Sequence, residues 1–272
     1  MTYRFERGRL YRMPTHFGPA PGPRQMPAEA NADPTRSPRK MLVTSSFLTN
    51  AAALEKHLPE GFTLSGEPVV TVEFHYMTGI DWLAGRGYTM IHIWWPAAFA
   101  GERDRADGRF LAVMWENLAD PIISGREEIG HPKLFADIPA ARAFQGAHHC
   151  SAEWMGFRFL ELEVSGLAEA PNVQLPASEG TLMLKYMPRT GEWGEADVCQ
   201  VTLTPALNSG VTIERRERGK GSVKFHRAAW SDLPTMVNVV NALADLPILE
   251  PRGGTLTHSR GGKPYFDQRI LR

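Results

Sequence analysis

Apolar and polar residues alternate with a period of two over most of the chain after residue 41. In residues 70–77, every second residue is a large apolar one. This alternation predicts β-strands with one buried face. Similar segments are residues 88–95, 109–115, 154–164, 181–187, 198–204 and 222–226. Because these segments are numerous and helical patterns are few, the chain is predicted to be a β-rich α+β protein with a closed or nearly closed antiparallel sheet.

Three segments carry helix signals instead, namely residues 50–58, 120–129 and 233–246. Their predicted N-caps are Asn50, Asp120 and Asp232. Pro59 would end the first helix, and Pro121 would lie in the first turn of the second. There is no alternation of strands and helices of the kind that builds a nucleotide-binding fold. The glycine-rich residues 219–222 are therefore interpreted as a tight turn and not as a phosphate site.

Residues 14–38 differ from the rest in being rich in proline and poor in large apolar residues. This composition predicts an extended N-terminal arm over residues 1–38, followed by a single domain over residues 39–272. Two fates for the arm are consistent with its sequence. It could wrap around a neighbouring subunit, or it could be disordered.

Charge and composition exclude several classes of protein. The 272 residues are 43% hydrophobic, and 30 lysines and arginines balance 30 aspartates and glutamates, so neither disorder nor nucleic-acid binding is expected. Residues 1–7 lack the apolar core of a secretory signal, and the apolar residues 91–100 are too few to span a bilayer. We therefore expect a cytoplasmic protein without a membrane segment. Cys150 and Cys199 are expected to be buried, reduced thiols.

The candidate chemistry lies in residues 125–137, where Lys133 follows a proline and precedes Leu-Phe-Ala. Water stabilises an ammonium far better than a free amine, so an apolar environment favours the neutral form of lysine. Only the neutral amine attacks a carbonyl to form a Schiff base. Lys133 is therefore the candidate nucleophile.

Residues Gly125-Arg126-Glu127 through His131-Pro132-Lys133 resemble the signature of the acetoacetate decarboxylase family, in which a Gly-Arg-Glu triplet precedes the Pro-Lys of the Schiff-base lysine. Later segments resemble further blocks of that family, so the resemblance runs from about residue 39 to residue 251. It implies an antiparallel β-cone or double barrel with a few peripheral helices, and assembly into a homo-oligomer. It also implies a lysine at the bottom of a funnel and no cofactor.

Carried over by motif, the resemblance gives Lys133 the imine-forming role and makes Glu73 an acid that faces it. The sequence departs from the family at two positions. Leu134 stands where the family usually has a second lysine, and Met90 stands where a further acid is expected. The remaining candidates for substrate binding are Arg126, Met90, Tyr265 and a cation at the start of the first strand, which is Arg39 or Lys40.

Without a neighbouring ammonium, the amine must be activated by some other cause. A lysine with an ordinary pKa of about 10.4 needs a fall of roughly 3.4 pH units, or about 4.6 kcal/mol, to be half neutral at pH 7. Burial alone can lower a lysine pKa by up to about 3 to 5 units. We therefore predict that desolvation activates Lys133, helped at most by Arg126 or His131.

The predicted partner is a small keto acid, and three functions remain open. The imine of Lys133 could release carbon dioxide from a β-keto acid, or its enamine could condense with an aldehyde and then dehydrate. The third alternative is a non-catalytic member of the fold that binds a ligand. We predict no metal site, because His148, His149 and Cys150 are consecutive on a strand and alternate between its faces.

Overall fold

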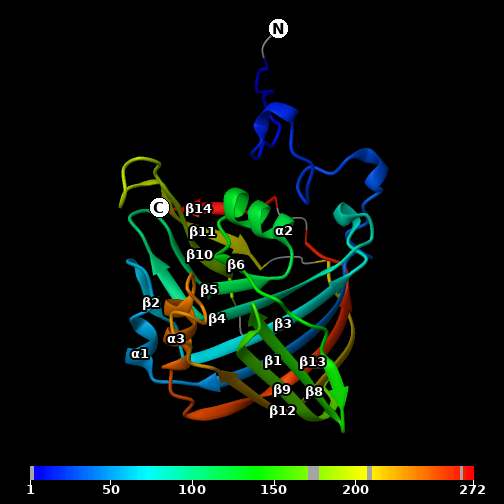
Figure 1. The fold of residues 1–272 in the computed structure, drawn as a ribbon, viewed down its shortest axis with the longest axis vertical. Coiled ribbons are helices and arrows are strands. Elements are labelled where there is room, and N and C mark those ends of the chain that lie inside the picture. Colours follow the sequence, from blue (N-terminus) through cyan, green and yellow to red (C-terminus); the bar gives the residue numbers. More distant parts are fainter. Residues whose placement is uncertain (1–2, 171–177, 207–209, 264–265) are drawn as a thin grey trace.

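The computed structural model describes residues 3–170, 178–206, 210–263 and 266–272, and its described strands form one sheet of 14 (Figure 1). The order along the sheet is β14-β11-β10-β5-β4-β3-β1-β13-β12-β9-β8-β7, with β2 paired to β4 and β6 paired to β5. The strands are β1 (Arg39–Leu48), β2 (Phe62–Leu64), β3 (Val69–Thr78), β4 (Tyr88–Ala100), β5 (Arg105–Glu116), β6 (Lys133–Phe135), β7 (Arg142–Phe144), β8 (Ala147–Trp154), β9 (Phe157–Glu169), β10 (Gly180–Pro188), β11 (Ala196–Pro205), β12 (Thr212–Phe225), β13 (Glu250–Arg260) and β14 (Arg269–Leu271).

Neighbouring strands are antiparallel except where β10 and β6 pair with β5. The β-rich, mostly antiparallel architecture expected from the alternation is thus confirmed. One expected strand, over residues 154–164, is right only from Phe157 onward, where β9 begins. Trp154 ends β8, and a hairpin turn follows, in which Met155 and Gly156 have φ of 50° and 88°. Glycine favours this left-handed conformation, and the two residues separate β8 from β9.

The helices are short: α1 (Ala51–Glu55), α2 (Ala119–Ser124) and α3 (Val237–Ala244). Asn50 caps α1, as predicted, by accepting a hydrogen bond of 3.0 Å from the backbone of Ala53. The prediction for α2 is wrong in detail, since Asp120 lies inside its first turn and the N-cap is Leu118. Residues 125–129 continue α2 as a π-helical turn, η4 (Gly125–Ile129).

The third helix is shorter than the predicted residues 233–246. It begins after Met236, and the Asp232 carboxylate instead accepts a hydrogen bond from the backbone of Ala229. Three single 3₁₀ turns complete the helical elements: η1 (Thr15–Phe17), η2 (Ala28–Ala30) and η3 (Asp81–Leu83). No helix in the described part of the chain is both long and apolar enough to cross a bilayer.

The main hydrophobic core covers one face of the sheet. Trp115 on β5 and Phe159 on β9 lie 5.2 Å apart between ring centroids, although their strands are far apart in the sheet order. The sheet therefore curls so that this face closes on itself. A second, smaller cluster lies on the opposite face and consists of Met77, Ile80, Met90, Leu111, Met114 and Met183.

The described part of the N-terminal arm lies beside α2 at the top of Figure 1. Arg12 and Arg24 from the arm both form ion pairs with Glu128 on η4. The arm therefore contacts its own chain next to the lysine motif of residues 125–133. The cysteine expectation is half right, because Cys150 is buried but Cys199 is exposed on β11.

Candidate active site

Lys133 begins β6, and its side chain is buried, with 6% of the residue exposed. The Nζ atom donates a hydrogen bond of 2.9 Å to the carbonyl of Pro121 in α2. It also lies 2.8 Å from Oε1 of Glu116, a fully buried carboxylate at the end of β5. A candidate nucleophile and a candidate base are therefore in direct contact inside the protein.

The Gly-Arg-Glu triplet explains how the lysine reaches this position. A Cβ atom at Gly125 would lie 2.5 Å from both Cε and Nζ of Lys133, so only glycine leaves room for the amine. The guanidinium of Arg126 donates a hydrogen bond of 2.8 Å to the backbone carbonyl of Lys133. The side chain of Arg126 is exposed, so its observed contact positions the lysine backbone.

Burial acts on both members of the Lys133–Glu116 pair in the direction of the uncharged form. It lowers the pKa of Lys133, which the contact with Glu116 partly restores. It raises the pKa of Glu116, which the contact with Lys133 opposes. Since the two atoms are within hydrogen-bonding distance, the lysine can lose its proton to the carboxylate and become nucleophilic.

A positive charge from the N-terminal arm also acts on Lys133. Burial is the main cause of the lowered pKa of Lys133, and the positive charge of Arg24 adds to it. Arg24 is held by Glu128 and by a hydrogen bond of 3.0 Å to the carbonyl of Ser124. Desolvation is thus the leading cause, as the sequence suggested, while the helping cation is Arg24 and neither Arg126 nor His131, the two expected helpers.

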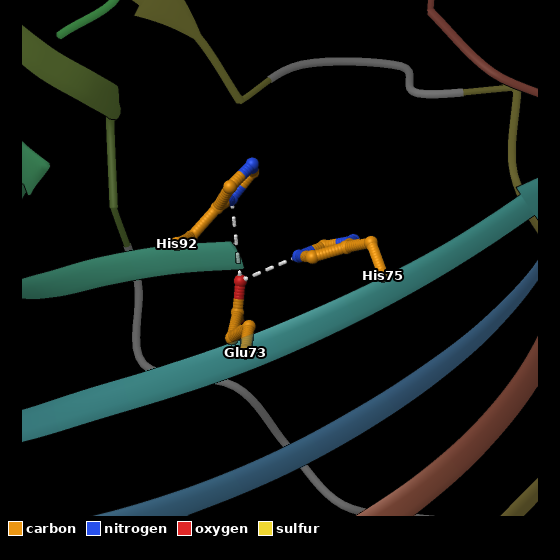
Figure 2. A group of neighbouring side chains, drawn as sticks. All are labelled: Glu73, His75 and His92. Carbon is orange, nitrogen blue, oxygen red and sulfur yellow. Dashed lines mark hydrogen bonds and ion pairs between the residues drawn. The ribbon is translucent and has the colours of Figure 1, made fainter. Parts of the chain in front are cut away.

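A second polar group lies on the same face of the sheet, two and three strands away from Lys133. It consists of Glu73 and His75 on β3 and His92 on β4 (Figure 2). Oε2 of Glu73 lies 3.1 Å from Nε2 of His75 and 3.6 Å from Nδ1 of His92. Because an ionised carboxylate only accepts hydrogen bonds, the ring nitrogens that face it carry the protons.

Burial favours neutral histidines in this group. It lowers the pKa of His75 to about 3 and also lowers the pKa of His92. Burial by itself raises the pKa of Glu73, but the contacts with the two histidines outweigh it and hold this pKa well below its usual range. Glu73 is therefore an ionised carboxylate oriented by two neutral imidazoles.

The donor atoms of Glu73, His75 and His92 lie within 4.8 Å of one another, a spacing that could hold a metal ion. Three cations act on this group, however. The charge of Lys40 reaches His75, and the charges of Arg109 and Lys133 reach His92. They would repel a divalent ion, so we interpret the group as a hydrogen-bonded network. His148, His149 and Cys150 follow one another on β8, with Cys150 buried.

The structure decides between the two candidate cations at the start of β1. Arg39 is exposed, which corrects its assignment to the site. Lys40 is half-buried on the face of Glu73, and burial lowers its pKa, while Glu73 raises it. The reason is the alternation of the strand, which turns neighbouring residues to opposite faces. Tyr265 lies outside the described residues.

Met90 takes the position opposite Glu116 in the register of β4 and β5. The acid that the family resemblance led us to expect at Met90 is thus matched by an acid on the adjacent strand. Sequence reasoning missed Glu116, His75, His92 and Arg109. The alternation held a signal for His75, because it lies two residues after Glu73 and hence on the same face. His92 is brought opposite Glu73 only by the pairing of β3 with β4.

The model of the acetoacetate decarboxylase family matches residues 12–260. The chain belongs to this family. An acetoacetate decarboxylase from Clostridium botulinum (strain Eklund 17B / Type B) is 25% identical over 221 residues, which cover 75% of this chain and 82% of that protein. The family match includes both the lysine motif and the strand that carries Glu73.

Solved structures of family members have the same fold. An acetoacetate decarboxylase from Legionella pneumophila is 20% identical, with a TM-score of 0.65 over 86% of this chain and 87% of that one. The enduracididine biosynthesis enzyme MppR, complexed with the condensation product of pyruvate and imidazole 4-carboxaldehyde, is 17% identical, with a TM-score of 0.62 over 86% and 87% of the two chains. Both solved structures therefore share the fold of this chain.

Proposed function

We propose that the protein is a lyase in which Lys133 forms a Schiff base with a small keto acid, and that its reaction is decarboxylation of a β-keto acid. The observation that carries this proposal is the buried amine of Lys133, 2.8 Å from the buried carboxylate of Glu116. A buried structural lysine also needs a charged partner, but a Schiff-base lysine needs a partner that takes its proton, since the amine must be neutral to attack. Burial shifts the pKa of Lys133 down and that of Glu116 up, in the direction of this transfer.

The reaction begins when Glu116 takes a proton from the Lys133 ammonium and the neutral amine attacks the keto carbon. A proton moves from the attacking nitrogen to the oxygen to give a carbinolamine. Glu116 then returns its proton to the hydroxyl group, which leaves as water and gives an iminium ion. The bond between the α-carbon and the carboxylate breaks, carbon dioxide leaves, and the bonding electrons move to the iminium nitrogen to give an enamine. A proton added to the α-carbon restores the iminium, and water hydrolyses it to release the ketone and the free lysine. Because Glu73 is ionised and its histidines are neutral, Glu73 would relay that proton from a water molecule to the α-carbon.

The surroundings of Lys133 support decarboxylation over other imine reactions. Met114 pairs with Lys133, and Met90 pairs with Glu116, so apolar side chains lie beside the reacting amine. An apolar environment destabilises a carboxylate relative to neutral carbon dioxide, which favours its loss. Met90 thus acts as part of the substrate-binding surface in this proposal.

The test is reductive trapping with borohydride during incubation with acetoacetate or pyruvate. We expect the ligand mass on the peptide that contains Lys133, no adduct in Lys133→Met, and an unchanged adduct in Lys224→Met, whose lysine is exposed on β12. Carbon dioxide release from acetoacetate is measured in parallel. A complete absence of adduct across a panel of keto acids would favour a ligand-binding protein without catalysis.

A second candidate is aldol condensation followed by dehydration, because the same enamine can attack an aldehyde. The observation that favours it is the second acid–base group, Glu73 with His75 and His92, since dehydration needs additional proton transfers. MppR, which has a similar fold, is complexed with a condensation product of pyruvate and an aldehyde. Incubation of pyruvate with an aldehyde, followed by mass spectrometry of the product, separates the two reactions.

We also propose that the protein is a homo-oligomer. Phe5, Met13 and Phe17 on the arm are 67%, 81% and 81% exposed, and a neighbouring subunit would cover such side chains. Light scattering coupled to size exclusion measures the mass directly. A monomeric mass at micromolar concentration would contradict this part of the proposal.

A further inference from the structure

Arg109 lies on the same face of the sheet as Glu73 and Lys133, but it belongs to neither of the two groups described above. Its guanidinium carbon lies 5.0 Å from the centre of the Trp94 ring. Its Nη2 atom lies 3.5 Å from the hydroxyl of Thr181 on β10. Stacking on an indole holds a guanidinium plane in a fixed orientation while leaving its edge free to bind an anion.

The charges on this face do not balance. Among the described residues of β1, β3, β4, β5 and β6, the buried or half-buried cations on it are Lys40, Arg109 and Lys133, and the carboxylates are Glu73 and Glu116. Glu116 is the ion-pair partner of Lys133. Glu73 is then the single carboxylate on this face for both Lys40 and Arg109. Charges removed from water need partners, so this end of the face is suited to an anionic ligand.

The two ends of the face suit two different carboxylates. Met114 and Met90 lie beside Lys133 and Glu116, respectively. The apolar environment that they provide promotes the loss of a carboxylate as carbon dioxide. Beyond Trp94 lies Arg109, which can hold a carboxylate through a charge-assisted, bidentate pair. A carboxylate held in this way is stabilised and would be retained in the product.

We propose that the substrate is a keto diacid, with one carboxylate β to the keto carbon and a second, distal carboxylate bound by Arg109. This inference rests on the proposed Schiff-base function of Lys133. In the reaction, only the β-carboxylate leaves, and the distal carboxylate stays on the ketone product. Arg109 therefore determines substrate specificity and does not take part in bond breaking.

The first experiment uses levulinate, a ketone with a distal carboxylate, and 2-pentanone, in which a methyl group replaces that carboxylate. Borohydride trapping on Lys133 is measured against concentration for both probes. We expect levulinate to react at 10- to 100-fold lower concentration. Arg109→Met should bring the ratio of the two effective concentrations close to one, and Arg109→Lys should restore part of the difference. Arg105→Met, an exposed arginine of the same strand, is the control.

The second experiment compares carbon dioxide release from 3-oxoadipate and 3-oxohexanoate. Both have a β-carboxylate, but a methyl group replaces the distal carboxylate in 3-oxohexanoate. A preference for the diacid that depends on Arg109 supports the proposal. If the monoacid and the diacid react equally, or if Arg109→Met weakens both probes equally, the diacid specificity is overturned while the Schiff-base function stands.

A third measurement separates the failure of the inference from the failure of the proposed function. Levulinate binding is measured by calorimetry in Lys133→Met, which cannot form an imine, with and without Arg109→Met. If the heat of levulinate binding disappears when Arg109→Met is added, the anion site is supported even if no imine forms in the wild-type protein. Binding that does not depend on Arg109 rejects the anion site.

Discussion

The sheet face that carries Lys133 also carries Glu73, and both residues are buried. Their environments nevertheless favour opposite states, neutral at Lys133 and charged at Glu73. Around Lys133, desolvation dominates, so the amine and the carboxylate of Glu116 are both driven toward their neutral forms. Around Glu73, hydrogen-bond donors from His75 and His92 dominate over the same desolvation, so the carboxylate stays ionised. Burial alone therefore does not decide the charge of a group, because the donors and acceptors that are buried with it also act.

The largest effect on the rate is expected from removing the carboxylate of Glu116, the base beside Lys133. Glu116→Gln keeps the shape and a hydrogen-bonding atom next to Lys133, but an amide cannot take the proton. We expect the maximal rate to fall by about 10²- to 10⁴-fold. Because the carboxylate raises the pKa of Lys133, its loss should also move the acidic limb of the pH–rate profile to lower pH. A shifted limb with an unchanged maximum would show that Glu116 only tunes the lysine.

The next effect concerns the space around the amine. In Gly125→Ala, the new methyl group would lie 2.5 Å from Nζ of Lys133 and would displace it from Glu116. Misplacing a reacting group by about 1 Å can cost about 10²-fold in rate, and borohydride trapping should weaken in parallel. Gly262→Ala is the control, because its Cβ meets a proline ring at 3.2 Å and lies away from the lysine. Equal rates in the two variants would contradict this account of the motif.

The second group can be tested through the pH dependence of stability. The pKa of His75 is about 3 because of burial, whereas an unfolded histidine has a pKa of about 6.5. Between these values the unfolded chain binds more protons, so the free energy of unfolding falls as the pH drops from about 6.5 to about 3. In His75→Gln this dependence should be shallower, as measured by urea unfolding at several pH values. His57→Gln, at an exposed histidine, should leave the slope unchanged.

A smaller effect is expected from the arm. Burial is the main cause of the low pKa of Lys133, and Arg24 adds to it. In Arg24→Met the ammonium form is less disfavoured, so the acidic limb of the pH–rate profile should move to higher pH by less than about one unit. Arg12→Met is a matched comparison, since Arg12 pairs with the same Glu128. A limb that does not move in Arg24→Met would assign the activation to burial alone.

The smallest effect on the rate profile is expected at Leu134, where the family usually has a second lysine. Leu134 pairs with Trp115 and packs against the main core, on the face opposite Lys133. An ammonium introduced by Leu134→Lys would therefore not approach the reacting amine. We expect lower stability in thermal unfolding and an acidic limb at its original pH. A limb displaced by one unit or more to lower pH would show that burial had not already activated Lys133.

Lys133, the β-rich fold and Glu73 could all be predicted from the sequence, because each depends on local order. Alternation of apolar residues identifies strands, and the triplet with Pro-Lys identifies the lysine motif. Glu73 was a candidate because its place in an alternating strand matched the family resemblance. The helix over residues 120–129 was found as well, but the π-helical form of its second half was not.

Other features depend on which strands are neighbours, and this was decided only by the tertiary structure. Glu116 and Lys133 are 17 residues apart, and they meet because β6 pairs in parallel with β5. Arg24 comes from an arm whose contacts no periodic pattern indicates, and Arg109 is held by residues of two other strands. The sequence by itself determined which residues could react, because side-chain chemistry and strand period are local. The pairing of distant strands determined their partners and charges, because desolvation and hydrogen bonding depend on what surrounds a group in space.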